Sequence, residues 1–282
     1  MSHTQPVYVV KVSGEREPWD PRKLERSLRS AKASDELVRE IIGHAEKDLQ
    51  DGMRTKDIYQ HAFSLLKRYD RPIAAQYSLK NALMQFGPSG FPFERFVAQI
   101  LEAQGYRTRV GVMERGACVT HEVDVIAEKN DERILVEAKF HNSAETKSDV
   151  KVALYVDARF RDIVKRLESE DGGAHFTHAW LITNTNFTSQ AIQYGNCAGL
   201  SLTGWNYPRG HTLQDLVQAT GTHPVTSLTT LTNSQKTALV NDGIVLCRDI
   251  VRDPAALKAL GLNTSRMNSV LKEGEALCAV ES

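Results

Sequence analysis

Apolar residues between positions 7 and 85 recur mostly at the three- and four-residue spacing of amphipathic helices. They follow a strand-like stretch, "VYVVKV", and a turn at "SGERE", which together predict a short hairpin. Asp20 and Pro21 predict the first helix start, because aspartate caps a helix and proline fits its first position. Three further helices are expected, beginning at Ser34, near Thr55 and at about Pro72, with the last running through Met84.

The pattern changes after this segment, where helical and strand-like stretches alternate. A helix is expected from Phe93 to Gln104, with Gly105 as its stop. Strands are predicted at "YRTRVGV", "VDVIA", "RILVEAKF", "HAWLIT" and "LSLTGW", and helices at "DARFRDIVKRLES" and "TSQAIQYGNCA". Such alternation predicts an α/β domain with a mixed sheet flanked by helices.

Breaks in the pattern divide the chain into domains. A Gly- and Pro-rich joint, "FGPSGFP", is typical of a linker, and the end of the chain is short and helical. We therefore expect a mainly helical domain at 1–86, a linker at 87–90, an α/β domain at 91–222 and a small helical domain at 223–282.

Composition narrows the class of protein without naming a function. The 282 residues are 41% hydrophobic and 25% charged, with zero formal net charge, so local patches would have to hold any polyanion. Four scattered cysteines without a C-x-x-C pair argue against a zinc site and a disulfide framework, and favour a reducing cytoplasm. No apolar run reaches membrane-spanning length and the start, "MSHTQP", is no signal peptide, so we expect a cytoplasmic protein without a membrane partner.

One predicted hairpin, "HEVDVIAEKNDERILVEAKFH", carries the candidate chemistry. Asp124 and Glu137 are symmetric about the turn at Asn130 and Asp131, so they would lie opposite each other, with Cβ atoms about 4.5–5.5 Å apart. Like charges at that distance are unfavourable, so the pair calls for a cation. Strand alternation adds Lys139 to the face of Glu137.

The central segment resembles the PD-(D/E)XK nuclease superfamily, and within it the Mrr-like restriction endonucleases. The matching strings are "FERFVAQILEAQGY", "EVDVIA", "ILVEAKF" and "ITNTNFTSQAIQYGNCAGLSLTGW". The resemblance implies a restriction-endonuclease-like fold that hydrolyses DNA phosphodiesters with Mg²⁺, for which Mn²⁺ can substitute. It implies Asp124, Glu137 and the carbonyl of Ala138 as metal ligands, Lys139 as the catalytic lysine and Glu94 as the acidic residue of the first helix.

Non-catalytic interpretations of these residues also stay open. The hairpin trio could be an exposed surface ion pair, worth about 0–1 kcal/mol, and Glu94 could be a solvated helix residue.

Basic residues around the hairpin are candidates for DNA contact. His141, Lys147, Lys151 and Arg159 could bind phosphates, which gives affinity independent of base sequence. The alternatives are a structural histidine at a strand end and a solvated basic helix face.

The opening segment resembles the ATP-cone, a nucleotide-sensing module, in "VVKVSGEREPWDPRKLERSLRSA", "RTKDIYQHAFSLL" and "AAQYSLKNAL". The resemblance implies ATP or dATP as a regulatory ligand. The candidate contacts are Lys11, Glu17, Asp20, Lys23 and Thr55. The family's usual basic residue after the motif lysine is replaced by Val12, and no G-x-x-x-x-G-K-[ST] loop exists, so the nucleotide would be a ligand and not a fuel. A degenerate cone kept for dimerisation is the alternative.

The final segment resembles helix-hairpin-helix domains only weakly, because the glycine-rich turn of that motif is absent from the sequence. A packing or dimerisation role is as reasonable as DNA contact.

Taken together, these features predict a Mg²⁺-dependent DNA endonuclease, similar to type IV restriction enzymes, that acts on foreign or modified DNA and is modulated by ATP or dATP. One active site cuts one strand, so a homo-oligomer is expected. The main alternative is a nucleotide-responsive DNA-binding regulator without cleavage activity. A purely structural, ATP-dependent assembly factor is a third possibility.

Overall fold

The computed structural model describes residues 6–169 and 175–279. The chain divides into two compact units, Met1–Leu79 and Lys80–Ser282. The polar start of the chain, from which we expected no signal peptide, lies at residues 1–5, outside the described part. Within the described ranges, no helix is long and apolar enough to cross a membrane.

Over residues 6–79, the first unit contains four helices and a small sheet. Its helices are α1 (Pro21–Ser30), α2 (Asp35–Asp48), α3 (Thr55–Tyr69) and α4 (Arg71–Tyr77). The sheet has the order β2-β1-β3, formed by β1 (Tyr8–Val10), β2 (Arg16–Pro18) and β3 (Met53–Arg54). The β1–β2 hairpin was expected, but the parallel partner β3 was not. A strand of two residues is too short to show an alternation of apolar and polar side chains.

The predicted helix starts in this unit are confirmed, and one predicted helix is wrong. The Asp20 side chain accepts from the backbone N–H of Arg22, and that of Ser34 accepts from Leu37. The helix expected from Pro72 through Met84 is interrupted after Tyr77, where α4 ends. At this break the Ser78 hydroxyl donates a hydrogen bond to the carbonyl of Ala75 in the preceding turn. The chain continues as α5 (Leu79–Leu83) and a 3-10 helix, η1 (Met84–Phe86).

The core of the first unit is made by the apolar stripes of its helices. Their buried members pack together with Val9 of β1 and are Leu24, Leu28, Val38, Ile41, Ala45, Ile58, Ala62, Leu66 and Ala74. Burial of these stripes explains why short helices that would be marginal alone are formed.

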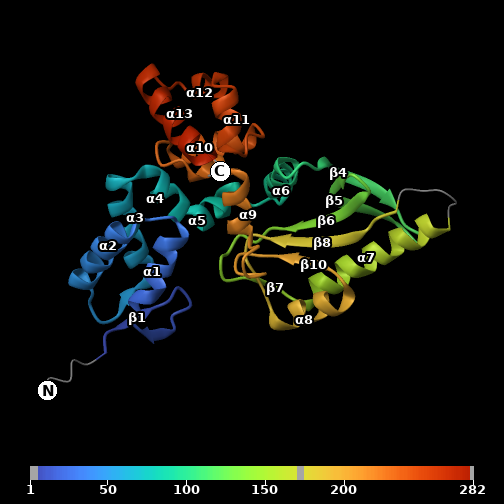
Figure 1. Ribbon diagram of the computed structural model, residues 1–282, viewed down its shortest axis with the longest axis horizontal. Helices are drawn as coiled ribbons and strands as arrows, with labels where there is room; N and C mark the ends of the chain where they lie inside the picture. Colours follow the sequence, from blue (N-terminus) through green and yellow to red (C-terminus); the bar gives the residue numbers. More distant parts are fainter. Residues whose placement is uncertain (1–5, 170–174, 280–282) are drawn as a thin grey trace. The chain divides into compact units, whose positions relative to one another are not determined.

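The second unit is built on a five-stranded mixed sheet of order β10-β8-β6-β5-β4 (Figure 1). Its strands are β4 (Arg107–Arg115), β5 (Thr120–Lys129), β6 (Glu132–Lys139), β8 (His178–Thr183) and β10 (Ser201–Thr203). Strands β4, β5 and β6 pair antiparallel, whereas β8 pairs parallel to both β6 and β10. The predicted α/β class with a mixed sheet is therefore confirmed.

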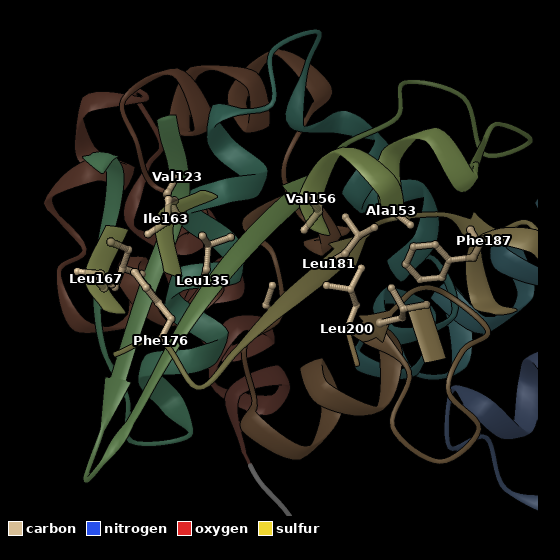
Figure 2. Packing of buried hydrophobic residues seen from close by; sticks show 14 residues of the cluster. Val123, Leu135, Ala153, Val156, Ile163, Leu167, Phe176, Leu181, Phe187 and Leu200 are labelled. Atoms are coloured by element: carbon tan, nitrogen blue, oxygen red, sulfur yellow. The ribbon is translucent and has the colours of Figure 1, made fainter. Parts of the chain in front are cut away.

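Helices cover this sheet from both faces. On one face α7 (Val150–Glu168) and α8 (Ser189–Ala198) bury side chains such as Ile163 and Val156 against Leu135 and Leu181 (Figure 2). On the other face α6 (Phe91–Ala103) packs, and the ring of Phe93 lies 5.7 Å from that of Phe140 between centroids. Because side chains alternate along β6, Leu135 and Glu137 belong to the face covered by α7.

Several elements of the second unit escaped the sequence pattern. A two-stranded parallel sheet pairs β7 (Lys147–Ser148) with β9 (Asn186–Phe187), and α9 (Leu213–Thr220) begins with a capping box at Thr212. The helical end of the chain was expected. It consists of η2 (Val225–Ser227), α10 (Asn233–Asn241), α11 (Cys247–Arg252), α12 (Ala255–Ala259) and α13 (Thr264–Cys278).

Candidate active site and nucleotide site

The predicted register of the β5–β6 hairpin is confirmed. Lys129 pairs with Glu132 beside the turn, and the ladder continues to Val125 opposite Val136. The residues that follow this last pair along the same register are Asp124 and Glu137, as the symmetry about Asn130 and Asp131 predicted.

The Asp124 carboxylate lies where the β5–β6 ladder ends. Its Oδ2 accepts a hydrogen bond from the backbone N–H of Ala138 at 2.8 Å, so the side chain takes the role of a strand acceptor and is fixed in direction. On the other side, Gly111 of β4 lies between the pairs Val110–Val125 and Val112–Val123 and has a φ of +63°. A residue with a side chain would be strained in this conformation, which makes glycine the suitable residue beside Asp124.

Glu137 and Lys139 lie on β6, which pairs with β8 on its far side. Glu137 is only 9% exposed, and burial, followed by the nearby Asp124, raises its pKa. Burial likewise raises the pKa of Asp124, although the bond from Ala138 opposes the change. The Lys139 charge lowers the pKa of both acids, so all three predicted side chains share one electrostatic site.

Glu94 joins this acidic cluster from the first turn of α6. Its pKa is raised to about 7, first by burial and then by Asp124, Glu122 and Glu137. A solvated helix residue would not have such neighbours. Sequence reasoning missed Glu122, although its position two residues before Asp124 on the same strand was an available signal.

The donor set fits a hard divalent cation. Asp124 and Glu137 supply oxygen ligands whose mutual repulsion a cation would relieve, and Mg²⁺ needs few protein ligands because it keeps several waters. Across residues 6–169 and 175–279, no three or more His, Cys, Asp or Glu side chains are arranged to hold a metal ion. Asp124 and Glu137 would hold a metal ion together with waters, and the carbonyl of Ala138 stays the predicted third protein ligand.

Arg159 was predicted as a phosphate contact in a basic groove near the hairpin, and that role stays a prediction. Its side chain is only 7% exposed, and Nη1 donates to the carboxylate of Glu137 inside the acidic site. Helix α7 turns this residue toward the sheet, a direction that its helical spacing alone did not reveal.

The other candidate DNA contacts lie near the same end of the sheet. His141 is tied down: its Nε2 lies 2.9 Å from the Ser148 hydroxyl, and its backbone N–H and C=O bond the buried amide of Asn184. Burial lowers its pKa. Lys147 and Lys151 are exposed on β7 and the first turn of α7, as phosphate contacts would need to be.

The five candidate nucleotide contacts come together in the first unit. The ammonium of Lys23 lies 2.6 Å from the Glu17 carboxylate, and that of Lys11 lies 3.1 Å from it. Glu17, Lys23 and Thr55 line one pocket together with Asp20, whose carboxylate also caps α1. Sequence reasoning placed these residues correctly on one surface, although whether they bind a nucleotide stays a prediction.

Aromatic residues complete this pocket and were missed. Tyr59 and Tyr77 line it with rings 5.0 Å apart between centroids and 12° from parallel, next to Trp19. Burial raises the pKa of Tyr77, so its hydroxyl stays protonated. These tyrosines lie on the faces of α3 and α4 that also hold core residues, so their spacing in the sequence did not distinguish them from core residues.

Comparisons with known families cover most of the chain. The family described as "ATP cone domain" matches residues 7–82, "Restriction endonuclease" of the Mrr catalytic type matches 88–206, and "AF1548-like, C-terminal" matches 223–278.

A protein of Archaeoglobus fulgidus described as "Uncharacterized protein" is 36% identical over 180 residues, which are 64% of this chain and 98% of that protein. The solved "Crystal Structure of Protein of Unknown Function AF1548" shares 34% identity and a TM-score of 0.54, covering 67% of this chain and 98% of that one. "MspJI Restriction Endonuclease in Complex with 27-mer Oligonucleotide" matches at 17% identity and a TM-score of 0.35, covering 60% and 35% of the two chains, too distant to bear on function. The chain therefore belongs to the AF1548-like family, and it joins an ATP cone domain to a restriction endonuclease domain.

Proposed function

We propose that this protein is a divalent-metal-dependent DNA endonuclease that restricts foreign or modified DNA and is modulated by an adenine nucleotide bound to its cone. The observation that carries the proposal is the convergence of Asp124, Glu137 and Lys139 at one end of the β5–β6 hairpin. The match of residues 88–206 to restriction endonucleases supports the same reaction class.

The reaction is hydrolysis of a phosphodiester. A water oxygen forms a bond to phosphorus, the bond from phosphorus to one sugar oxygen breaks, and that oxygen receives a proton. A bound Mg²⁺ would supply Lewis acidity toward the phosphate oxygens and would lower the pKa of water at the site. Asp124 and Glu137 would hold the ion, and the Lys139 ammonium would orient the attacking water and stabilise charge on the phosphoryl oxygens.

A plasmid-cleavage assay tests this proposal. Supercoiled DNA incubated with the full chain and Mg²⁺ or Mn²⁺ should be nicked or cut. Lys139→Ala and Asp124→Asn should each lower the rate by about 10²–10⁴-fold, the range for loss of a proton-transfer or charge-stabilising group. Lys258→Ala, an exposed lysine of α12, is the matched control and should cleave at the wild-type rate.

The same assay separates the main alternative. A DNA-binding regulator without cleavage activity would retard DNA in a mobility-shift gel while leaving supercoiled plasmid intact in every metal. Methylated and unmethylated plasmids compared side by side test the part of the proposal that concerns modified DNA. A homo-oligomer is expected if both strands are cut in one encounter, and sedimentation of the active protein would measure it.

A further inference from the structure

Arg159 is held in the acidic site from two sides. Nη1 donates to the Glu137 carboxylate and Nη2 donates to the hydroxyl of Tyr155, one helical turn earlier on α7. The guanidinium carbon lies 4.5 Å from the centroid of the same tyrosine ring, a distance typical of a cation–π contact. The guanidinium plane is therefore oriented as well as charged.

One donor of this guanidinium is unused. Arg159 Nε is buried and has no hydrogen-bond partner within the described part of the chain. A buried donor without a partner is unfavourable, and such groups in native proteins call for an explanation. A guanidinium presents its N–H groups as a fork that matches the oxygens of a phosphate.

The guanidinium lies next to one exposed side chain. Tyr155 is 54% exposed, whereas Arg159 and Glu137 are buried. The guanidinium thus contacts the buried Glu137 on one side and the exposed Tyr155 on the other.

We propose that Arg159 is a further catalytic residue, which bonds Glu137 in the substrate-free protein and donates to a non-bridging oxygen of the scissile phosphate in the DNA complex. Tyr155 is its positioning residue. The inference rests on the proposed nuclease function and adds a phosphate-binding group that the hairpin motif does not contain. Donation to the phosphoryl oxygens stabilises the charge that develops on them during hydrolysis.

An arginine that acted only as a structural counter-ion to the carboxylates would need fewer specific features. Any positive charge beside Asp124 and Glu137 would offset their repulsion, and lysine would serve. The fork, the aromatic ring beneath it and the unpartnered Nε are the features that a phosphate-binding role requires and a counter-ion does not.

Single-turnover cleavage of plasmid DNA with Mn²⁺ tests the proposal. Arg159→Lys and Arg159→Ala should each lower the rate constant at saturating enzyme by about 10²–10³-fold, the usual effect of removing one charge-stabilising donor. Added guanidinium ion should partly restore cleavage by Arg159→Ala. Tyr155→Phe keeps the ring and loses the hydroxyl, so it should lower the same rate constant by about tenfold, with the half-saturating enzyme concentration and the melting temperature unchanged. Arg161→Ala, an exposed arginine of the same helix, is the control and should cleave normally.

A second measurement does not depend on cleavage. Mn²⁺ binding to the DNA-free protein, followed by electron paramagnetic resonance, should be no weaker in Arg159→Ala, because the guanidinium no longer competes for Glu137. Wild-type cleavage by Arg159→Lys, or a loss of activity in Arg159→Ala that merely follows lost Mn²⁺ binding or unfolding, would overturn the inference and leave the nuclease intact. A wild-type protein that cleaves no DNA in any metal would overturn the proposed function, and this inference with it.

Discussion

At the residue scale, other carboxylates lie near the Glu94 carboxylate, and this makes the stability of the folded protein depend on pH. Burial and the carboxylates of Asp124, Glu122 and Glu137 raise its pKa to about 7, from an ordinary value of 4.5. The folded protein therefore holds this proton more tightly than the unfolded chain does. The contribution of protonated Glu94 to the free energy of unfolding is therefore complete below about pH 4.5. It is lost as the pH rises through about 7.

We expect the metal-free protein to lose stability between pH 5 and pH 8 because Glu94 becomes charged. After allowance for solvent screening at this half-buried group, the loss attributable to it is about 1–2 kcal/mol. Urea unfolding at both pH values in a chelator would measure it. Glu94→Gln should be less sensitive to pH, and Glu168→Gln, at the exposed end of α7, should behave as wild type. An unchanged pH dependence in Glu94→Gln would contradict this electrostatic account.

At the element scale, two glycines inside helices have different surroundings. A Cβ at Gly43 of α2 would meet nothing within 4 Å. A Cβ at Gly195 of α8 would lie 2.6 Å from one methyl carbon of Leu202 and 3.0 Å from its Cγ. Leu202 is a buried residue of β10, so this glycine sets how closely α8 approaches the sheet.

The same substitution should therefore have opposite effects in the two helices. Gly43→Ala should stabilise the first unit by about 0.5–1 kcal/mol, since alanine restricts the unfolded chain and favours the helix. Gly195→Ala should destabilise the second unit by about 1–3 kcal/mol, because the added methyl overpacks the contact with Leu202. Denaturant titrations of the two variants give both values. Equal signs would mean that helix propensity outweighs packing at Gly195.

At the scale of the whole molecule, the chain carries two candidate ligand sites in separate compact units. The pocket of the first unit lined by Glu17, Asp20, Lys23 and Thr55, here called the cone pocket, combines the Lys23 ammonium, suited to phosphates, with a pair of tyrosine rings, suited to a base. Lys11 lies beside it, paired with Glu17. The candidate nuclease site lies at the end of a different sheet. The proposed nucleotide binding and the proposed DNA cleavage can therefore be tested in separate assays.

We expect ATP or dATP to stabilise the first unit against heat. At a free concentration of about 100 times Kd, the gain is about 2.7 kcal/mol. Calorimetry with ATP, dATP and GTP would measure it, and cleavage rates in the same solutions would give the sign of regulation. Lys23→Glu should abolish both the stabilisation and the change in rate, while Lys47→Glu, an exposed lysine of α2, should keep both. Full stabilisation of Lys23→Glu by ATP would exclude the cone pocket as the binding site.

The sequence by itself determined the features that depend on local spacing. The caps at Asp20 and Ser34, the mixed α/β class and the register of the hairpin all follow from period, turn residues and symmetry about Asn130 and Asp131. A two-residue turn defines which strand positions face each other, so the carboxylate pair could be identified without coordinates.

Tertiary structure alone decided which distant residues meet at the site. Arg159 reaches Glu137 from a helix 22 residues later, and Asn184 bonds His141 across 43 residues. The direction of a helical side chain depends on how its helix packs against the sheet, and the periodicity of α7 is consistent with more than one such orientation. For the same reason the sequence indicated Arg159 as a DNA contact near the hairpin without showing that packing of α7 on the sheet turns its charge toward the buried carboxylates.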